Sequence, residues 1–254
     1  MSFTVQAKAA LRLCYFNGIL PLWRTPLLVG AVFLTPFSFL FFLYVIAPPE
    51  LFPTGVVGGI LFTALFTGNG MLNDCAYLRL ERQLQQVFVA SPMRPLSYVL
   101  GMALSELAFT LPALVLFLGI LEVVHPFSAL GFAALLGVVL LTWLMSCSLG
   151  FLISTFFRQL REIWPIGTLI FSTLSVLPPI FYPATRIPPH WEWVAFIAPS
   201  TWAGQLADQA AGVSLGGALS PSLLSNPWFD LGGLAVWTVG FALAALFLAR
   251  WREP

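Results

Sequence analysis

The chain has 254 residues, of which 59% are hydrophobic and only 8% are charged, with a formal net charge of +1. A soluble domain has about 25% charged residues, so this chain lacks the ionic groups needed to cover a water-facing surface. The composition therefore excludes an ordinary soluble protein and favours a membrane protein surrounded by lipids. The sequence contains no basic run that would predict a nucleic acid as partner.

Residues 1–24 predict an amphipathic helix, because apolar side chains recur every three or four positions and so share one helical face. These residues are Val5, Ala9, Leu13, Phe16 and Leu20. Lys8 and Arg12 lie away from this face, and Pro21 is expected to end the helix. Such a cationic helix is expected in the inner-leaflet interface, with its apolar face among acyl chains. The alternative is an irregular leader.

Six further segments are apolar over about 20 residues, the length that a helix needs to cross a bilayer. They comprise residues 27–47, 55–75, 100–124, 129–157, 163–182 and 231–249. The sequence therefore predicts an all-α membrane protein with six transmembrane helices in a single domain.

The cationic residues predict the orientation of these helices. If the N-terminus is cytoplasmic, ten of the eleven Lys and Arg residues fall on the cytoplasmic side, and only Arg186 falls outside. The cytoplasmic loops of membrane proteins carry such an excess of positive charge. We therefore expect both termini in the cytoplasm and a multi-pass protein of the cell inner (cytoplasmic) membrane.

The segment 77–95 is the main feature predicted on the cytoplasmic side. Four apolar residues follow helical spacing and form a stripe beside charged and amide side chains. The stripe comprises Leu80, Leu84, Val87 and Phe88. Pro92 and Pro95 then break the helix. A short helix of this kind suits docking in the groove of a partner protein; the alternative is a helix that only touches lipid headgroups.

The segment 183–230, between the fifth and sixth predicted spans, combines many apolar residues with repeated prolines. Its first part, with Trp191, Trp193 and Trp202, is too apolar for water and too interrupted to span. Irregular backbone at membrane depth is tolerated where it is buried in protein, so re-entrant outer half-helices are expected here. Residues 212–227 are rich in Gly, Ser and Leu and predict an external loop.

Several polar residues inside the predicted spans are candidates for lining a transport pathway. They are Asn69 and Asn73 in the second span, Glu106 in the third, and Thr168 and Ser172 in the fifth. For the Asn, Thr and Ser residues, the alternative is ordinary hydrogen bonding between helices. An ionisable side chain in hydrocarbon costs at least about 2.5 kcal/mol and so marks a functional candidate. Glu106 therefore either lines the pathway or pairs with a cation such as Arg94.

No catalytic or metal-binding set is predicted. Residues 212–216 match the Gly-x-Ser-x-Gly pattern of a nucleophile elbow, but they lie in a Gly-rich external loop and not in a strand–helix turn. Cys14, Cys75 and Cys147 share no metal-ligand spacing. A membrane-embedded enzyme would need polar catalytic groups at depth. An ion-coupled secondary transporter would show repeated halves or titratable groups along the path. Both are kept as alternatives.

Two motifs stand at fixed positions in this layout. The first runs Leu80-Glu81-Arg82-Gln83-Leu84-Gln85-Gln86-Val87, then Ser91-Pro92-Met93-Arg94, with Gly101 soon after. The second comprises Tyr182-Pro183, Ile187-Pro188-Pro189, Trp191 and Ala198-Pro199-Ser200-Thr201-Trp202. Together they resemble type-2 ABC exporter permeases, with a charged stretch before the third span and a Pro- and Trp-rich outer segment. Gln83 stands where that family often has Gly, and Ala198 where it usually has Asn.

The resemblance implies a permease that dimerises, as a homodimer or with a paralogous permease, and that pairs with a cytoplasmic ABC ATPase subunit. Residues 79–88 would form the coupling helix. The residues implied in ATPase coupling are Arg79, Glu81, Arg82, Leu84, Phe88, Ser91, Pro92 and Arg94. Those implied in an outer gate segment are Pro183, Pro188, Trp191, Pro199 and Trp202. The substrate implied is hydrophobic, lipid-linked, or glycan- or drug-like.

The single lysine predicts where ATP would bind. A P-loop needs a Gly-rich turn followed by Lys against the phosphates, and Lys8 follows no such turn. ATP and Mg are therefore expected to be bound by a partner ATPase, while this chain is expected to hold no cofactor and to be no enzyme itself.

Overall fold

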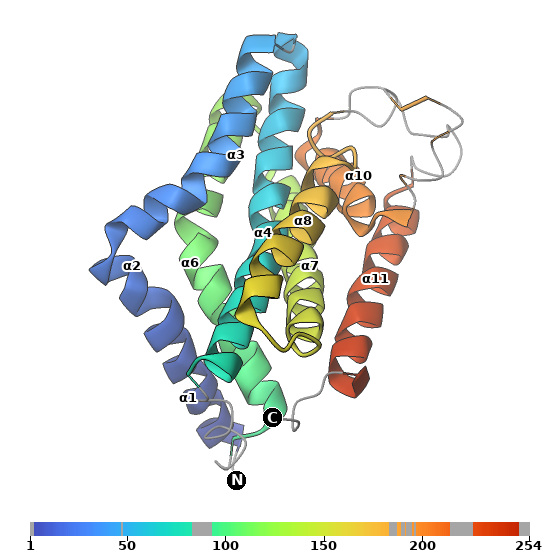
Figure 1. Cartoon of the computed structure of the whole chain (residues 1–254). Helices are drawn as coiled ribbons and strands as arrows, with labels where there is room; N and C mark the ends of the chain where they lie inside the picture. Colours follow the sequence, from blue (N-terminus) through green and yellow to red (C-terminus); the bar gives the residue numbers. More distant parts are fainter. Residues whose placement is uncertain are drawn as a thin grey trace.

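A computed structural model describes residues 3–46, 48–82, 93–182, 187–188, 191, 195, 197–213 and 226–248. These residues form helices and connecting turns, and no strand occurs among them (Figure 1). The helices are α1 (Phe3–Cys14), the π-helix η1 (Tyr15–Ile19), α2 (Leu20–Arg24), α3 (Pro26–Ile46), the 3-10 helix η2 (Pro49–Leu51), α4 (Phe52–Leu80), α6 (Pro95–Val124), α7 (Ala129–Ser154), α8 (Leu160–Val176), α10 (Pro199–Ala211) and α11 (Pro227–Leu248). The all-α fold class is confirmed for the described part of the chain.

Four helical segments of the described residues are long and apolar enough to cross a membrane. They are Pro49–Leu80, Pro95–Val124, Ala129–Ser154 and Pro227–Leu248. These segments coincide with the second, third, fourth and sixth predicted spans. The first and fifth predicted spans coincide with α3, of 21 residues, and α8, of 17 residues. The chain is therefore a multi-pass membrane protein.

The ends of two helices differ from the prediction. α4 continues through Leu80, beyond the expected end at Cys75, because its polar last turns find partners within the bundle and need no water. α8 ends at Val176, before the expected end at residue 182. The reason is that Pro178 and Pro179 have no N–H to donate and disfavour a helical conformation in the residue before them.

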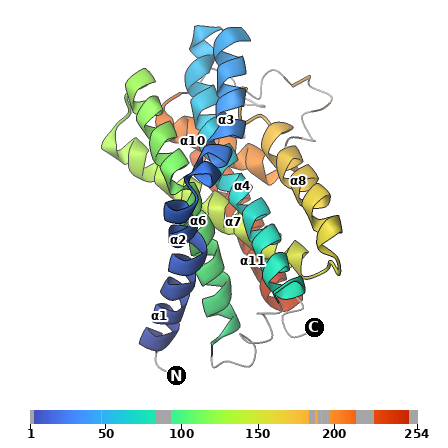
Figure 2. The ribbon, with the colours of Figure 1, turned by 60° about the vertical axis from the view of Figure 1, so that its left-hand side comes forward.

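α4 lies at the centre of the bundle and contacts α3, α6, α7, α8 and α10 (Figures 1 and 2). Its backbone and that of α7 approach closely, because a Cβ added to Gly150 would lie 2.1 Å from the carbonyl oxygen of Gly68. The Ser146 hydroxyl accepts a hydrogen bond from the Gly68 N–H at 3.2 Å and donates one to the Leu65 carbonyl. Small residues permit such contact between membrane helices, so α4 and α7 form one tightly joined pair.

The N-terminal helix packs along α6 (Figure 2). The face of the N-terminal segment that is buried includes Gln6, Ala10 and Gly18. Gly18 lies so close to α6 that an added Cβ would meet the Ser105 carbonyl oxygen at 2.6 Å. The contact with α6 uses this buried face together with Leu13, whose Cβ would lie 3.1 Å from a Cβ added to Gly101, so only part of the apolar face that the sequence spacing selects packs on α6.

The structure leaves two residues of the predicted apolar face exposed and contradicts the helix end predicted at Pro21. Val5 and Phe16 are 44% and 60% exposed, so these two residues remain available for contact with lipid. The expectation that Pro21 ends the helix was wrong. The π-helical turn of η1 precedes Pro21, which falls in the first turn of α2, where its missing N–H is not needed.

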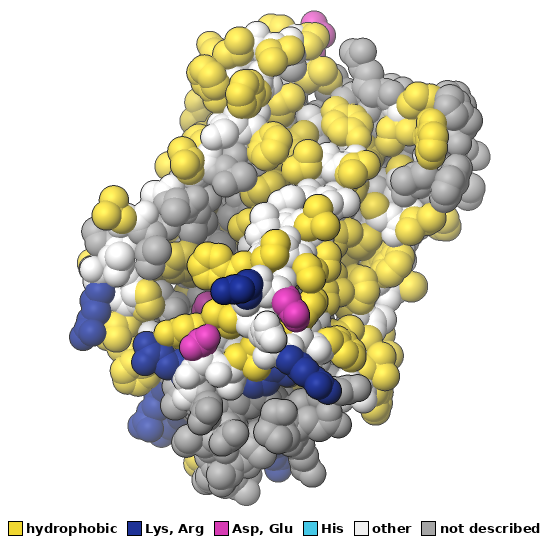
Figure 3. Space-filling view, viewed as in Figure 1, with side chains coloured by type: hydrophobic (Ala, Val, Ile, Leu, Met, Phe, Trp, Pro, Cys, Tyr) yellow, Lys and Arg dark blue, Asp and Glu magenta, His cyan; other side chains and the backbone are white. Residues whose placement is uncertain are grey.

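Hydrophobic side chains cover most of the described surface in Figure 3, and Lys and Arg side chains gather in its lower half. Large apolar residues are exposed on the outer helices, for example Tyr44 on α3 at 72% and Phe247 on α11 at 81%. A water-soluble protein rarely exposes contiguous apolar surface of this extent. This surface is that of a protein embedded in lipid.

Candidate functional site

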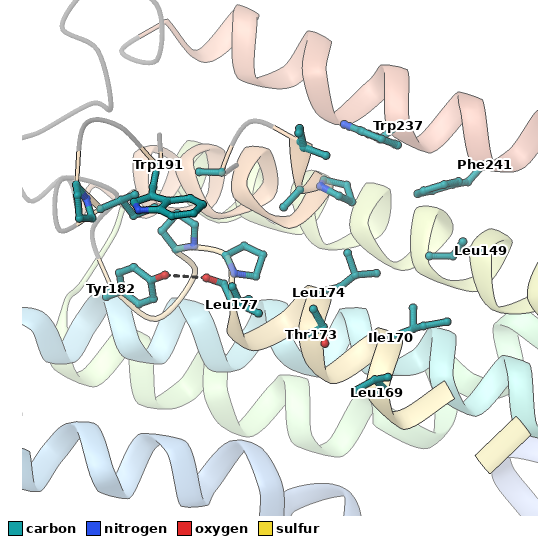
Figure 4. Close-up of a pocket in the computed structure, with 18 residues that line it drawn as sticks. Leu149, Leu169, Ile170, Thr173, Leu174, Leu177, Tyr182, Trp191, Trp237 and Phe241 are labelled. Carbon is teal, nitrogen blue, oxygen red and sulfur yellow. Dashed lines mark hydrogen bonds between the residues drawn. The ribbon is translucent and has the colours of Figure 1, made fainter. Parts of the chain in front are cut away.

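A cavity of about 960 Å³ lies between α8, α10 and α11, with α7 contributing at one end (Figure 4). The lining residues are Leu149, Leu169, Ile170, Thr173, Leu174, Leu177, Pro178, Pro179, Tyr182, Ile187, Pro188, Trp191, Ala195, Ile197, Ala198, Pro199, Trp237 and Phe241. None of these residues is charged. Leu169 is 67% and Trp191 53% exposed, so the cavity opens to the surface.

The polar groups of the lining are few. The Tyr182 hydroxyl donates a hydrogen bond to the Leu177 carbonyl at 2.7 Å, so its proton is used within the protein (Figure 4). Thr173, Trp191 and Trp237 contribute the other polar side-chain atoms. A buried polar ligand group would find few partners here and would lose its hydration. The cavity is therefore suited to an apolar chain or ring system.

The end of α8 and the start of α10 shape the cavity. The Ser200 hydroxyl, in the first turn of α10, donates a hydrogen bond to the Leu174 carbonyl of α8 at 2.5 Å. Gly204 permits close contact with the turn after α8, because an added Cβ would lie 3.0 Å from the Pro179 carbonyl oxygen. These contacts join α10 to the end of α8, on one side of the cavity.

Three of the residues predicted in the outer gate segment meet at this cavity: Pro188, Trp191 and Pro199. Trp202 lies elsewhere, between α10 and α11, where its ring contacts Phe229 at a centroid distance of 5.5 Å and lies against Gly233. Pro183 lies outside the described residues.

The predicted pathway residues do not form one site. Asn73 Nδ2 donates hydrogen bonds to the carbonyl and the Oδ1 of Asn69, at 2.8 and 3.3 Å, so the two amides interact along α4. Asn69 faces α8, because a Cβ at Gly167 would lie 2.8 Å from its Oδ1. Thr168 is exposed and Ser172 half-buried on α8, and neither belongs to the cavity lining.

Glu106 is buried and has a different partner from the one expected. Its carboxyl group lies within hydrogen-bonding reach of that of Asp74 on α4. Gly70 lies beside it, one helical turn before Asp74. The Arg94 side chain is exposed, and the backbone N–H of Arg94 donates to Gln6 Oε1 at 3.0 Å. The neighbour of Glu106 is therefore the carboxyl group of Asp74 and not the expected cation, Arg94.

Arg79 binds within the chain. Its guanidinium donates hydrogen bonds to the carbonyl oxygens of Thr155 at 2.8 Å, of Ser154 at 2.6 Å and of Phe157. These three carbonyls belong to the C-terminal end of α7 and the turn that follows it. A cation at a helix C-terminus satisfies free carbonyls and offsets the helix dipole. Arg79 therefore joins the last turn of α4 to the end of α7.

The other coupling candidates are only partly described. Glu81 and Arg82 are exposed at the end of α4, and Arg82 Nε donates to the Tyr77 hydroxyl at 2.9 Å. Arg94 precedes α6 and is exposed. The remaining candidates, Leu84, Phe88, Ser91 and Pro92, lie outside the described residues.

Two acidic residues of the predicted outer segment have buried carboxyl oxygens, which the sequence reasoning missed; Asp208 as a whole is half-buried. Asp230, in the first turn of α11, is fully buried and accepts a hydrogen bond from Gln209 Nε2 at 2.8 Å. Burial raises the pKa of the Asp208 carboxyl on α10 well above its usual range. The only sequence signal was that both acids belong to this largely apolar segment. Within the described residues, no group of three or more His, Cys, Asp or Glu is placed to hold a metal ion.

Comparison with known proteins shows which family this helical bundle represents. The family model described as ABC-2 type transporter matches residues 9–210, which run from α1 through most of α10 and include segment 77–95. No curated protein matches the chain significantly. The match covers most of the chain, and it agrees with the multi-pass helical structure and with the two sequence motifs. The chain therefore belongs to the ABC-2 type transporter family and is a transmembrane permease of an ABC transporter.

Proposed function

We propose that this chain forms the translocation pathway of an ATP-driven exporter for a substrate with a large hydrophobic part. The cavity between α8, α10 and α11 carries this proposal, because about 960 Å³ of space is lined without a charged side chain among the described residues. This volume lies within the range typical of small-ligand sites. A lipid-linked or drug-like substrate would place its apolar part there.

The proposed membrane arrangement has six spans, with α3 and α8 as the first and fifth and both termini in the cytoplasm of the cell inner membrane. In this orientation ten of the eleven Lys and Arg residues lie on the cytoplasmic side, as the excess of positive charge in cytoplasmic loops favours. α1 and α2 would contact the inner-leaflet interface, and α10 would be a re-entrant outer half-helix, as its Pro-rich start and its contact with the end of α8 favour.

The orientation can be tested by thiol labelling in a variant that lacks the three native cysteines. Single cysteines at Glu50 and Glu122 are expected to react with a membrane-impermeant reagent from the outside. Single cysteines at Glu81 and Arg161 are expected to react only after the membrane is made permeable. All four of these positions are exposed. Reaction of all four from the outside would contradict the arrangement.

The ATPase is proposed to be a separate ABC subunit that binds segment 77–95 through Glu81 and the residues that follow it, and the permease is proposed to act as a dimer, with a second copy or a paralogue. Family membership supports an ATPase partner. Glu81 and Arg82 are exposed at the start of this segment and are available for charge contacts. Reversing both charges, Glu81→Arg with Arg82→Glu, is expected to reduce co-purification of the ATPase several-fold.

The transport proposal is tested with the permease–ATPase complex in proteoliposomes that contain a fluorescent long-chain phospholipid as probe. Ala198→Trp fills part of the cavity and is expected to reduce ATP-dependent movement of the probe several-fold. Val239→Trp on α11 is the matched control, since Val239 is 55% exposed and outside the cavity. Equal transport by the two variants would remove the cavity from the pathway, and ATP-independent movement in the unmodified complex would contradict the exporter.

A further inference from the structure

Arg79 occupies a position that connects two cytoplasmic parts of the protein. It lies in the last turn of α4, directly before the residues proposed to contact the ATPase. Its guanidinium contacts the carbonyls of Ser154, Thr155 and Phe157, which are 75 to 78 residues away in sequence. Residues 155–159 form the whole connection between α7 and α8.

The guanidinium is suited to this contact and has little capacity left for another. Its fixed fork of donors can bind several acceptors in one plane, and both of its terminal nitrogens already donate to carbonyls. Its Nε is buried. Ser154 and Thr155 are buried as well, at 3% and 6% exposure. An Arg held in this way cannot at the same time present its charged end to a docked protein.

The contact extends a connection between α4 and α7 that already runs through the membrane. Deeper in the bundle, Gly150 packs against the Gly68 carbonyl, and Ser146 exchanges hydrogen bonds with α4. Beyond the end of α7, however, only five residues lead into α8. Because α8 supplies one side of the cavity from Leu169 onward, a displacement of residues 155–159 moves the start of the helix that carries this cavity wall.

We infer that Arg79 is a positioning residue, which makes the end of α4 and the α7–α8 connection move together and so passes ATPase-driven movement to α8. This inference rests on the proposed function, since it assigns a role within the ATP-driven cycle. It replaces the expected role of Arg79 as a contact of the ATPase.

The test uses the permease–ATPase complex and measures probe lipid moved per ATP hydrolysed. Arg79→Met keeps most of the side-chain volume and removes all three hydrogen bonds. It is expected to retain the ATPase and its basal hydrolysis while lowering the transport-to-hydrolysis ratio about tenfold. Arg79→Lys keeps the charge but offers a single ammonium group in place of the guanidinium. Its transport-to-hydrolysis ratio is expected to lie between those of Arg79→Met and the unmodified chain.

A distance measurement gives a second readout. Spin labels at Tyr77 on α4 and Arg161 on α8 are expected to keep one distance in the nucleotide-free and vanadate-trapped complexes. In Arg79→Met the distance distribution is expected to broaden and to differ between the two states. If Arg79→Met fails to fold, the same comparison is made in Arg79→Lys, whose smaller change is expected to leave the fold intact.

The outcomes separate this inference from the proposed function. If the unmodified complex moves the probe without ATP, the proposed function fails. If the unmodified complex is ATP-dependent and Arg79→Met transports with a normal ratio, the inference is overturned. Loss of the ATPase from Arg79→Met, with a folded permease, would also overturn it, because Arg79 would then be a docking contact.

Discussion

The carboxyl groups of Asp74 on α4 and Glu106 on α6 lie within hydrogen-bonding reach of each other inside the helix bundle. Glu106 is only 7% exposed, and Asp74 is half-buried. Two negative charges on neighbouring carboxyl groups would repel strongly in a low-dielectric site. We therefore expect the two groups to share one proton. A proton shared by the two carboxyl groups would join α4 to α6 in addition to their apolar packing.

The first prediction concerns this pair. Glu106→Gln can still donate a hydrogen bond to Asp74 and is expected to keep stability within about 1 kcal/mol. Glu106→Ala leaves the Asp74 carboxyl without this partner and is expected to cost about 1–3 kcal/mol. Thermal unfolding of the purified permease in detergent checks both values.

The same variants address the ion-coupled alternative. An ATP-driven permease does not need the proton to leave the pair, so Glu106→Gln is expected to transport at a normal rate. A proton-coupled transporter would lose activity with Gln, because an amide cannot release a proton in the cycle. Loss of transport by a stable Glu106→Gln variant would therefore favour the alternative.

A second prediction concerns the contact between α4 and α7. Gly150→Ala would place a methyl group against the Gly68 carbonyl and is expected to destabilise the protein by about 1–3 kcal/mol through overpacking. Gly137→Ala on the same helix meets no atom within 4 Å and is expected to be neutral or slightly stabilising. Yield of monodisperse protein and thermal unfolding compare the two. Equal stability of both variants would contradict the close approach of the two backbones.

A third prediction concerns Trp202, which connects α10 to α11. Gly233→Ala would bring a Cβ to 2.5 Å from the Trp202 ring, whereas Gly232→Ala, its neighbour in sequence, meets nothing within 4 Å. Only Gly233→Ala is expected to shift the ring and to change the environment of the tryptophan. Protease sensitivity between α10 and α11 is expected to rise in Gly233→Ala alone. A similar rise in Gly232→Ala would show that helix propensity, and not this contact, is responsible.

A fourth prediction is a pH dependence caused by Asp208. Because burial raises its pKa in the folded protein, the folded state keeps the proton at pH values where the unfolded chain has lost it. Stability is therefore expected to fall as pH rises from about 4, the unfolded pKa of Asp, until the folded pKa is passed.

Replacement of this carboxyl tests the assignment. Asp208→Asn is expected to flatten the stability profile above pH about 4 and to raise stability at neutral pH, because an amide is uncharged at every pH and folds without taking up a proton. Glu122→Gln is the control, since Glu122 is exposed on α6 and its replacement is expected to leave the profile unchanged. The measurement is thermal unfolding of each variant across the pH range. A profile for Asp208→Asn as steep as that of the unmodified chain would contradict this account.

Hydropathy and residue type were sufficient to predict the helical class and four of the spans, because length and apolar composition decide whether a helix suits a bilayer. The continuation of α4 to Leu80 was missed, since polarity after Asn73 resembles an exit into water when its partners are unknown. The hydrogen bonds of Arg79 within the chain were missed for the same reason. Its acceptors are backbone carbonyls, which carry no sequence signal.

The cavity was predictable only in part. Pro188, Trp191 and Pro199 were selected from local composition, and they do meet at its lining. Leu149, Trp237 and Phe241 come from helices that are adjacent only after folding, and apolar residues in a membrane protein are too common to be selected by type. Likewise, Asp74 and Glu106 lie 32 positions apart, and only the packing of α4 on α6 pairs them.

With α8 as the proposed fifth span, its early end has a consequence for the surrounding bilayer. Its 17 residues extend about 26 Å at 1.5 Å per residue, whereas the hydrocarbon core of a bilayer is about 30 Å thick. A short hydrophobic length is accommodated by local thinning of the lipid. Lipid beside α8 is thus expected to be thinner than average, which would shorten the distance a hydrophobic substrate must travel between the cavity and the outer headgroups.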